Sequence, residues 1–203
     1  MITQDMAFPG GRANMWYMKA QKWFHNGILA AVLPFFLICA QAGAQTPVLD
    51  DLFARLLSAD EPASARIEQD IWREWSKSGS PAMDLLLQRG RDAMALGDTD
   101  AAIEHLTALI DHAPDFAEGW NARATAYFQA GDLGPSIGDI GHVLTLNPRH
   151  FGALAGLGMI FEQLEKPAKA LEVYRAALAI HPHLAGVLQS VERLETEAAG
   201  QEL

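Results

Sequence analysis

The chain has 203 residues, of which 50% are hydrophobic and 20% charged, a composition that excludes an intrinsically disordered protein. From Gln45 onward it carries 12 basic and 24 acidic side chains, a net charge of −12. Such an acidic body repels phosphate backbones, because nucleic-acid affinity comes largely from Lys and Arg, and we therefore expect no nucleic-acid partner. Alternatively, the acidity is simply that of a solvated face that keeps the protein in solution.

Residues 1–44 have the pattern of an extension followed by a secretory signal peptide. Lys19 and Lys22 precede an apolar run of 13 residues, Ile28–Ala40. Ala42-Gly43-Ala44 follows, with a small residue at both positions that a signal peptidase reads. A membrane span needs about 20 apolar residues, so this shorter run favours a cleaved signal over an uncleaved anchor, which is the alternative.

Cleavage between Ala44 and Gln45 would give a periplasmic or secreted protein that meets a membrane only through its signal before cleavage. It would also remove Cys39, the chain's one cysteine. The exported form would then have neither a disulfide framework nor a catalytic thiol. A basic start, an apolar middle and a cysteine-free body suit a bacterial periplasm.

Residues 45–82 predict two short helices. The first has an apolar stripe at helical spacing: Leu49, Leu52, Phe53, Leu56 and Leu57. Asp60-Glu61-Pro62 separates it from the second, whose apolar face holds Ile67, Ile71, Trp72 and Trp75. The two tryptophans either pack in a core or form a patch on which a ligand stacks.

Residues 83–184 contain three units related by a step of 34 residues: 83–116, 117–150 and 151–184. Proline recurs at Pro114, Pro148 and Pro182, each 34 residues after the last. The same step aligns large and small side chains: Leu86, Trp120 and Leu154; Gly90, Ala124 and Gly158; Ala93, Tyr127 and Phe161; Ala102, Ser136 and Ala170; Leu106, Ile140 and Tyr174. Chance similarity would rarely keep all these classes in phase.

Each unit predicts two helices joined by a tight turn. The turns lie at Gly97-Asp98, Gly131-Asp132 and Glu165-Lys166-Pro167. Glycine supplies the left-handed conformation that ends a helix, and the following Asp can cap the next one. The recurring prolines end the second helices. We expect the small residues of the first helix to face those of the second, so that the helix axes approach closely.

This alternation of aromatic, small and proline positions resembles the tetratricopeptide repeat family. The resemblance implies an all-α solenoid of antiparallel helix pairs, with residues 45–82 as a degenerate hairpin that caps the array and packs differently. Residues 185–203 would be a capping helix with a frayed end. Its apolar stripe runs through Leu184, Val187, Leu188, Val191 and Leu194.

Gly138 and Gly141 lie inside the expected second helix of the middle unit. Each costs about 1 kcal/mol relative to alanine in a helix interior. They either admit a close neighbour or simply weaken that helix, and the residues alone do not separate these readings.

The resemblance implies a concave face lined by the first helix of each unit, where a peptide or partner helix would bind. The candidate residues are Asp84, Leu87, Arg91 and Met94; Glu118, Asn121, Thr125, Phe128 and Gln129; and Ala155, Met159, Glu162 and Gln163. Alternatively, Met94 and Met159 complete the core. Relatives that grip a C-terminal carboxylate use Lys, Asn and Arg at positions held here by Leu87, Arg91, Ala122, Gly152 and Gly156, so that mode is not supported.

The sequence offers no catalytic constellation, and we expect neither an enzyme nor a metal or other cofactor. The pair His181-x-His183 flanks a repeat proline, but metal sites need several converging ligands, and histidines in this setting are usually plain loop residues. The expected function is an exported protein-binding scaffold in envelope complex assembly. A structural subunit that self-associates through its end hairpins is the alternative.

Overall fold

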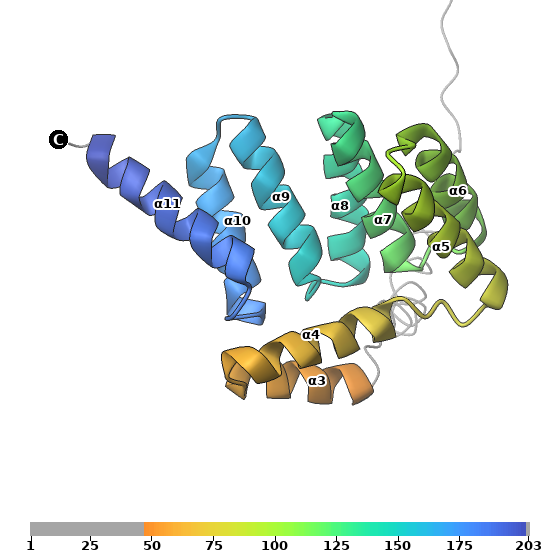
Figure 1. Cartoon of the computed structure of the whole chain (residues 1–203), viewed down its shortest axis with the longest axis horizontal. Helices are drawn as coiled ribbons and strands as arrows, with labels where there is room; N and C mark the ends of the chain where they lie inside the picture. Colours follow the sequence, from red (N-terminus) through yellow and green to blue (C-terminus); the bar gives the residue numbers. More distant parts are fainter. Residues whose placement is uncertain (1–46, 202–203) are drawn as a thin grey trace, which may run out of the picture. The chain divides into compact units, whose positions relative to one another are not determined.

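The structure is a computed structural model that describes residues 47–201, and every regular element in that range is an α-helix (Figure 1). This confirms the predicted all-α class. The helices are α3 (Pro47–Ser58), α4 (Glu61–Trp75), α5 (Pro81–Ala95), α6 (Thr99–His112), α7 (Ala117–Ala130), α8 (Leu133–Leu146), α9 (Phe151–Gln163), α10 (Pro167–Ile180) and α11 (Ala185–Gln201). In this described range no helix is long and apolar enough to cross a bilayer. The predicted signal peptide lies outside the described residues.

Helices α5 to α10 form three pairs that lie side by side in Figure 1. Each pair turns through a left-handed residue, Gly97 (φ 76°), Gly131 (φ 82°) and, in the third unit, the non-glycine Glu165 (φ 55°). Asp98 caps α6 as predicted, because its carboxylate accepts a hydrogen bond from the Ala101 N–H at 3.0 Å. The equivalent Asp132 is the N-cap residue of α8 as predicted, but its side chain makes no capping hydrogen bond.

The recurring prolines set where the second helices end. Helices α6, α8 and α10 stop at His112, Leu146 and Ile180, each two residues before its proline. Proline has no backbone N–H to continue the hydrogen-bond ladder, and it disfavours helical conformation in the residue before it. The predicted helix ends are therefore confirmed.

The small repeat positions are buried, and Gly90 and Gly158 each lie against a bulky residue of the second helix. A Cβ on Gly90 would lie 2.5 Å from Cγ of Leu106, and one on Gly158 would lie 2.2 Å from Cε1 of Tyr174. These glycines make room for a bulky side chain one turn further along the second helix. In the middle unit the Ser136 hydroxyl donates to the Ala124 carbonyl at 2.7 Å. The crossings are therefore close-packed by different means.

Nothing lies within 4 Å of a Cβ built on Gly138 or Gly141. Gly138 and Gly141 therefore face open space, which decides between the two interpretations of these residues. They weaken the helix and admit no neighbour.

An ion pair inside the second repeat unit also hydrogen-bonds to the first unit. Arg123 of α7 donates to both carboxylate oxygens of Asp139, at 2.8 and 2.9 Å, and to the Thr107 hydroxyl at 3.0 Å. The side chains of Arg123 and Asp139 are only 14% and 8% exposed. Removing one partner of a buried pair typically costs about 3–5 kcal/mol, so this pair holds α6, α7 and α8 in register.

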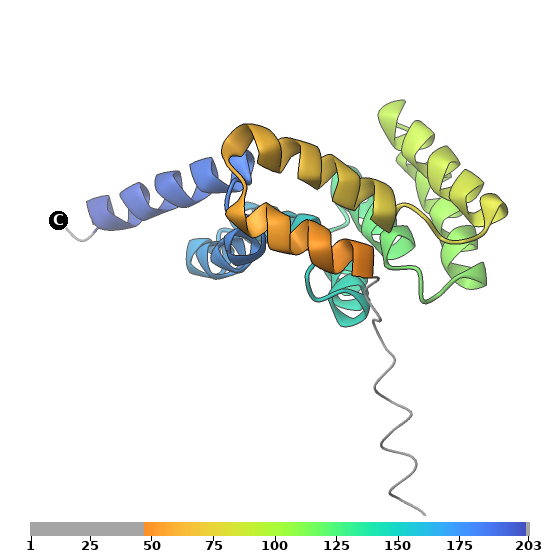
Figure 2. The same ribbon diagram turned by 90° about the horizontal axis from the view of Figure 1, so that it is seen from below.

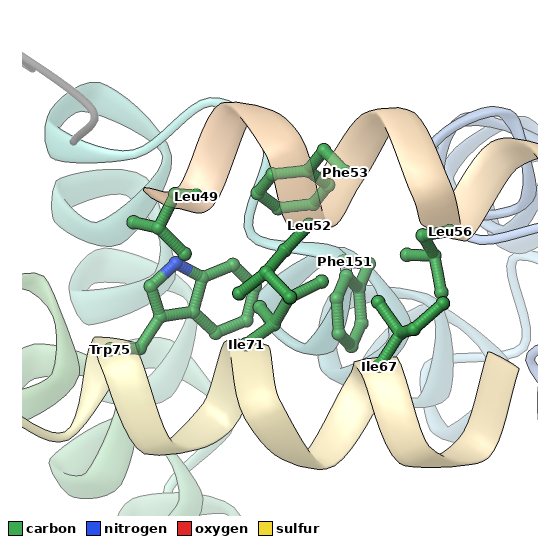
Figure 3. Close-up of a cluster of buried hydrophobic side chains, with 8 residues drawn as sticks. All are labelled: Leu49, Leu52, Phe53, Leu56, Ile67, Ile71, Trp75 and Phe151. Carbon is green, nitrogen blue, oxygen red and sulfur yellow. The ribbon is translucent and has the colours of Figure 1, made fainter. Parts of the chain in front are cut away.

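The hairpin of α3 and α4 does pack differently from the repeats. Its apolar stripes face each other, and Phe151 from the start of α9 lies in the same cluster (Figure 3). Ile180 at the end of α10 and Leu184 in the turn before α11 pack against this cluster. The hairpin therefore lies across the third repeat (Figure 1, Figure 2), and this differs from the cap at the end of the array that we had expected.

Polar contacts fix the hairpin to distant turns of the chain. Arg149 donates to Asp50 at 2.5 Å, and the Nε2 atoms of His181 and His183 lie 3.2 Å from the Glu68 carboxylate and 3.0 Å from the Ala59 carbonyl oxygen. Their partners are 99, 113 and 124 residues away in the sequence. The hairpin is thus an integral part of this unit of the fold.

A buried network joins the end of α4 to all three repeats. Arg91 donates to the Ser76 hydroxyl at 3.2 Å and to Glu118 at 2.5 Å. The Nδ1 of His150 accepts from the Ala153 N–H, which leaves its Nε2–H to donate to Glu118 at 3.2 Å. The His150 ring stacks on Trp75, with centroids 4.2 Å apart. The Glu118 carboxylate therefore has its hydrogen-bond donors within the protein.

Helix α11 covers α10 at the other end of the third repeat. Val187 and Leu194 are buried there, and Leu184 and Val191 pack against them. Leu188 was predicted to lie in the same stripe, but its side chain is 43% exposed. Arg193 of α11 donates to Glu162 of α9, which fixes the capping helix to that repeat.

Candidate functional site

Two adjoining hollows open on the face of the repeats that the first helices line. One has a volume of about 600 Å³ and the other about 370 Å³. They share Phe128, Gly152, Ala155 and Met159. We call the two hollows together the groove. A volume of this size, walled largely by apolar side chains, is typical of a ligand site.

The walls of the groove come from repeats two and three, from the hairpin and from the capping helix. The smaller hollow is lined by Asn121, Ala124, Thr125, Phe128, Gln129, Ser136, Ile140, Gly152, Ala153, Ala155, Gly156, Met159 and Ile160. The larger is lined by Glu68, Trp72, Phe128, Phe151, Gly152, Ala155, Met159, Glu162, Gln163, Tyr174, Leu184, Gly186, Val187 and Ser190. The groove is therefore a composite of elements far apart in the sequence.

Helix α9 forms the floor because the side chains on its open face are small. A Cβ on Gly152 would stand 2.5 Å from Cη2 of Trp72, so this glycine allows the indole of α4 to pack directly on α9. Ala155 and Gly156 continue the floor, and Met159 stands in it with half of its side chain exposed (50%). Met159 thus lines the groove, whereas Met94 packs against the core of the first repeat.

The structure brings part of the predicted concave face together in the groove. The predicted residues that line it are Asn121, Thr125, Phe128, Gln129, Ala155, Met159, Glu162 and Gln163. Those that lie outside it are Asp84, Leu87, Arg91, Met94 and Glu118. The groove is thus a feature of repeats two and three, and the first repeat contributes none of its lining.

The excluded residues are engaged within the protein. Leu87 is 2% exposed and belongs to the core of the first repeat. Asp84 accepts hydrogen bonds from the backbone and hydroxyl of Ser78, at 2.9 and 2.5 Å, and so fixes the linker between α4 and α5. Arg91 and Glu118 belong to the buried network described above. Their predicted place on the open face was wrong, because spacing along a helix does not reveal what packs on it.

Hydrogen bonds set the charge state of the acids in the larger hollow. A hydrogen bond from the His181 ring lowers the pKa of Glu68, although burial opposes it. Burial raises the pKa of Glu162, but hydrogen bonds from Arg193 and Tyr174 outweigh burial and leave it below its ordinary value. Burial, reinforced by Glu162, raises the pKa of the Tyr174 hydroxyl, which donates to that carboxylate at 2.7 Å. Both carboxylates are therefore ionised at neutral pH.

Sequence reasoning missed the walls that α4 and α11 supply. Glu68 and Trp72 come from α4, and Gly186, Val187 and Ser190 come from α11. Trp72 was expected either to pack in a core or to form a ligand patch. Its ring packs on Gly152 and also lines the larger hollow. The sequence contains no pattern that predicts the other residues of these walls, because the repeat positions do not show that the hairpin packs on the third unit.

His181 and His183 serve the fold. His181, predicted to be a plain loop residue, has a side chain only 1% exposed and donates a hydrogen bond to the Glu68 carboxylate. Nε2 of His183 lies 3.0 Å from the carbonyl oxygen of Ala59, the residue after α3. In the described part of the chain, no group of three or more His, Cys, Asp or Glu is arranged to hold a metal ion.

Comparisons with known proteins agree with this architecture. The family model for the tetratricopeptide repeat matches residues 87–141 and 136–185. A TPR repeat-containing protein of Rhizobium etli is 37% identical over 153 residues, which cover 75% of each chain.

Solved structures share the fold at low sequence identity. The TPR domain of Sgt2 from Aspergillus fumigatus has a TM-score of 0.57 and 21% identity, covering 61% of this chain and 83% of that one. The first TPR domain of Spaghetti (RPAP3), bound to an HSP90 peptide, has a TM-score of 0.55 and 22% identity, covering 58% and 95%. TPR2B of yeast Sti1, in complex with an Hsp70 segment, has a TM-score of 0.53 and 21% identity, covering 60% and 99%.

The repeat phase, the stacked helix pairs and the relative from Rhizobium etli lead to one assignment. The chain belongs to the tetratricopeptide repeat family.

Proposed function

We propose that this protein is a non-catalytic binding module that holds a segment of another protein in the groove. The observation that carries the proposal is the groove itself: an apolar floor with Phe128 half-buried and Met159 half-exposed, rimmed by the polar side chains Asn121, Gln129 and Gln163. An apolar surface with a few polar groups at its edge is how proteins give both affinity and orientation to a bound segment.

The solved neighbours support this use of the fold, because several of them hold chaperone peptides. The mode differs here. Arg91, the one basic residue at the positions that would grip a terminal carboxylate, is bonded to Glu118 and Ser76 and lines neither hollow. Recognition of the chaperone-tail type is therefore not part of the proposal.

A photo-crosslinking amino acid placed at Met159 tests the groove in living cells. We expect a crosslinked partner from that site. Leu85 is a matched control, since the two side chains are 50% and 51% exposed on first helices of their repeats, and Leu85 lines neither hollow. Equal crosslinking from both sites, or none from Met159, would contradict the proposal.

We also propose that the module acts outside the cytoplasm, in the assembly of an envelope complex. The signal pattern of residues 1–44 supports this, and so does the absence of cysteine from Gln45 onward. N-terminal sequencing of the protein from an extracytoplasmic fraction should give Gln45 as the first residue. Recovery with its apolar run still attached would support an anchor instead. The hairpin gives the self-associating alternative little support, because most of its apolar stripe is buried within the chain. Leu57, predicted to lie in that stripe, is instead 57% exposed.

A further inference from the structure

The groove has a charge character that defines the chemistry of its partner. Resting on the function proposed above, we propose that the bound segment carries a bulky apolar side chain with a lysine or arginine beside it, and that Glu68 receives this cation. The apolar side chain would sit on Met159 and Phe128. The partner is thus a protein segment with a basic side chain, not an acidic tail.

All the charge in the lining of the groove is negative. Glu68 and Glu162 line the larger hollow, and no lysine, arginine or histidine lines either one. The chain from Gln45 onward is itself acidic, with 12 basic and 24 acidic side chains. Complementary charge speeds association and rejects partners of the wrong sign, so this groove favours a cation and opposes a carboxylate.

The two carboxylates are not equivalent. Glu162 is paired with Arg193, which offsets its charge. Glu68 accepts from the Trp72 indole N–H at 3.2 Å and from the buried His181 ring at 3.2 Å, and no lysine or arginine of the described chain pairs with it. Its side chain is 31% exposed. A carboxylate has about four acceptor sites, so Glu68 keeps capacity for a further donor.

The apolar side chain and the cation must be neighbours in the ligand, because the residues proposed to bind them line the same hollow. Glu68 and Trp72 form one wall of the larger hollow, while Phe128 and Met159 belong to its floor. Methionine adapts its shape to different partners, so the floor accepts an aliphatic or an aromatic anchor. The combination selects a class of side-chain pair, not a single sequence.

A random peptide library displayed on phage, selected on the purified full chain, tests this inference. Peptides retained by the wild type but lost on Met159→Gln, and kept on the control Leu85→Gln, define the groove-dependent pool. We expect lysine and arginine to be enriched beside large apolar residues in that pool. A pool rich in acids or without charge bias would overturn the inference and leave the proposed function standing. An empty pool would overturn the proposed function itself.

A charge variant then locates the cation. For a synthetic peptide from the pool, Glu68→Gln should weaken binding by about two- to fivefold, the range for a partly exposed ion pair. Replacing the peptide's lysine by glutamine should remove this difference. Glu61→Gln deletes the same charge from the exposed start of α4 and should leave affinity unchanged. Equal losses from both variants, measured by fluorescence anisotropy, would show a general effect of charge and overturn the role of Glu68.

Discussion

Gly90 and Gly158 allow the two helices of their repeats to pack closely, because neither residue has a side chain. Each lies against a large residue of the second helix, Leu106 or Tyr174, at a distance that leaves no room for a Cβ. The middle unit has Ala124 at this position and packs it with Ile140. Within each unit, a larger residue on the second helix therefore goes with a smaller residue at the facing position of the first helix, as close packing requires.

Replacing Gly158 by alanine should destabilise the protein by about 1–3 kcal/mol, the usual cost of overpacking a core. The new Cβ would meet Tyr174 at 2.2 Å, and that ring cannot easily withdraw because its hydroxyl is bonded to Glu162. Gly141→Ala is the matched control in a helix with open space around it, and should raise the free energy of unfolding by about 0.4–1 kcal/mol. Urea unfolding followed by circular dichroism measures both, and changes of the same sign would refute the packing argument.

At the scale of elements, the hairpin of α3 and α4 decides what the site looks like. It supplies Glu68 and Trp72 to the groove while burying its apolar stripe against Phe151. The tryptophans carry much of this contact: Trp75 stacks on His150 and Trp72 packs edge-on to Phe151. The same helix thus stabilises the fold and shapes the site.

The attachment of the hairpin should weaken in acid. Folding lowers the pKa of Glu68 through its hydrogen bond with His181, so its stabilising contribution is present above the ordinary value of 4.5 and is lost as the pH falls through the lower folded value. The wild type should therefore lose more free energy of unfolding between about pH 6 and about pH 3 than Glu68→Gln does. Parallel urea titrations across this range provide the measurement, with Glu61→Gln as a control that should follow the wild type. Identical curves for wild type and Glu68→Gln would contradict it.

At the scale of the molecule, this repeat protein departs from a simple linear stack. In an ideal solenoid each unit touches only its neighbours, and stability adds up unit by unit. Here Asp50, Ala59 and Glu68 bond residues 99, 124 and 113 positions away. The N-terminal hairpin and the third repeat are thereby coupled, although two repeats separate them in the sequence.

Damage in α3 should therefore reach the third repeat. Phe53 is 4% exposed in the shared cluster, and truncating it to alanine should cost about 3–5 kcal/mol. We expect hydrogen exchange of the backbone amides to accelerate in α9 and α10 as well as in α3 and α4. Mass spectrometry resolves these segments, and acceleration confined to α3 and α4 would show that the hairpin opens independently.

The sequence by itself determined the repeats. A 34-residue phase of large, small and proline positions was enough to predict the helix pairs and the family, because these features act locally: proline stops a helix and glycine allows a left-handed turn. It also predicted that the first helices of the second and third repeats face a ligand surface. Phe128, Gln129 and Met159 line the groove, and its use as a ligand surface stays a prediction.

Tertiary structure alone decided where the hairpin docks, and with it the walls of the groove. The apolar stripes of α3 and α4 predict that these helices are buried on one face. The hydrophobic effect is non-directional, so the stripes do not predict which surface of the protein covers them. Arg91 and Glu118 had the spacing of groove residues, yet the docked hairpin and His150 turn them into an internal network. Which surface stays open depends on contacts between residues far apart in the chain, and a periodic pattern within one helix carries no record of them.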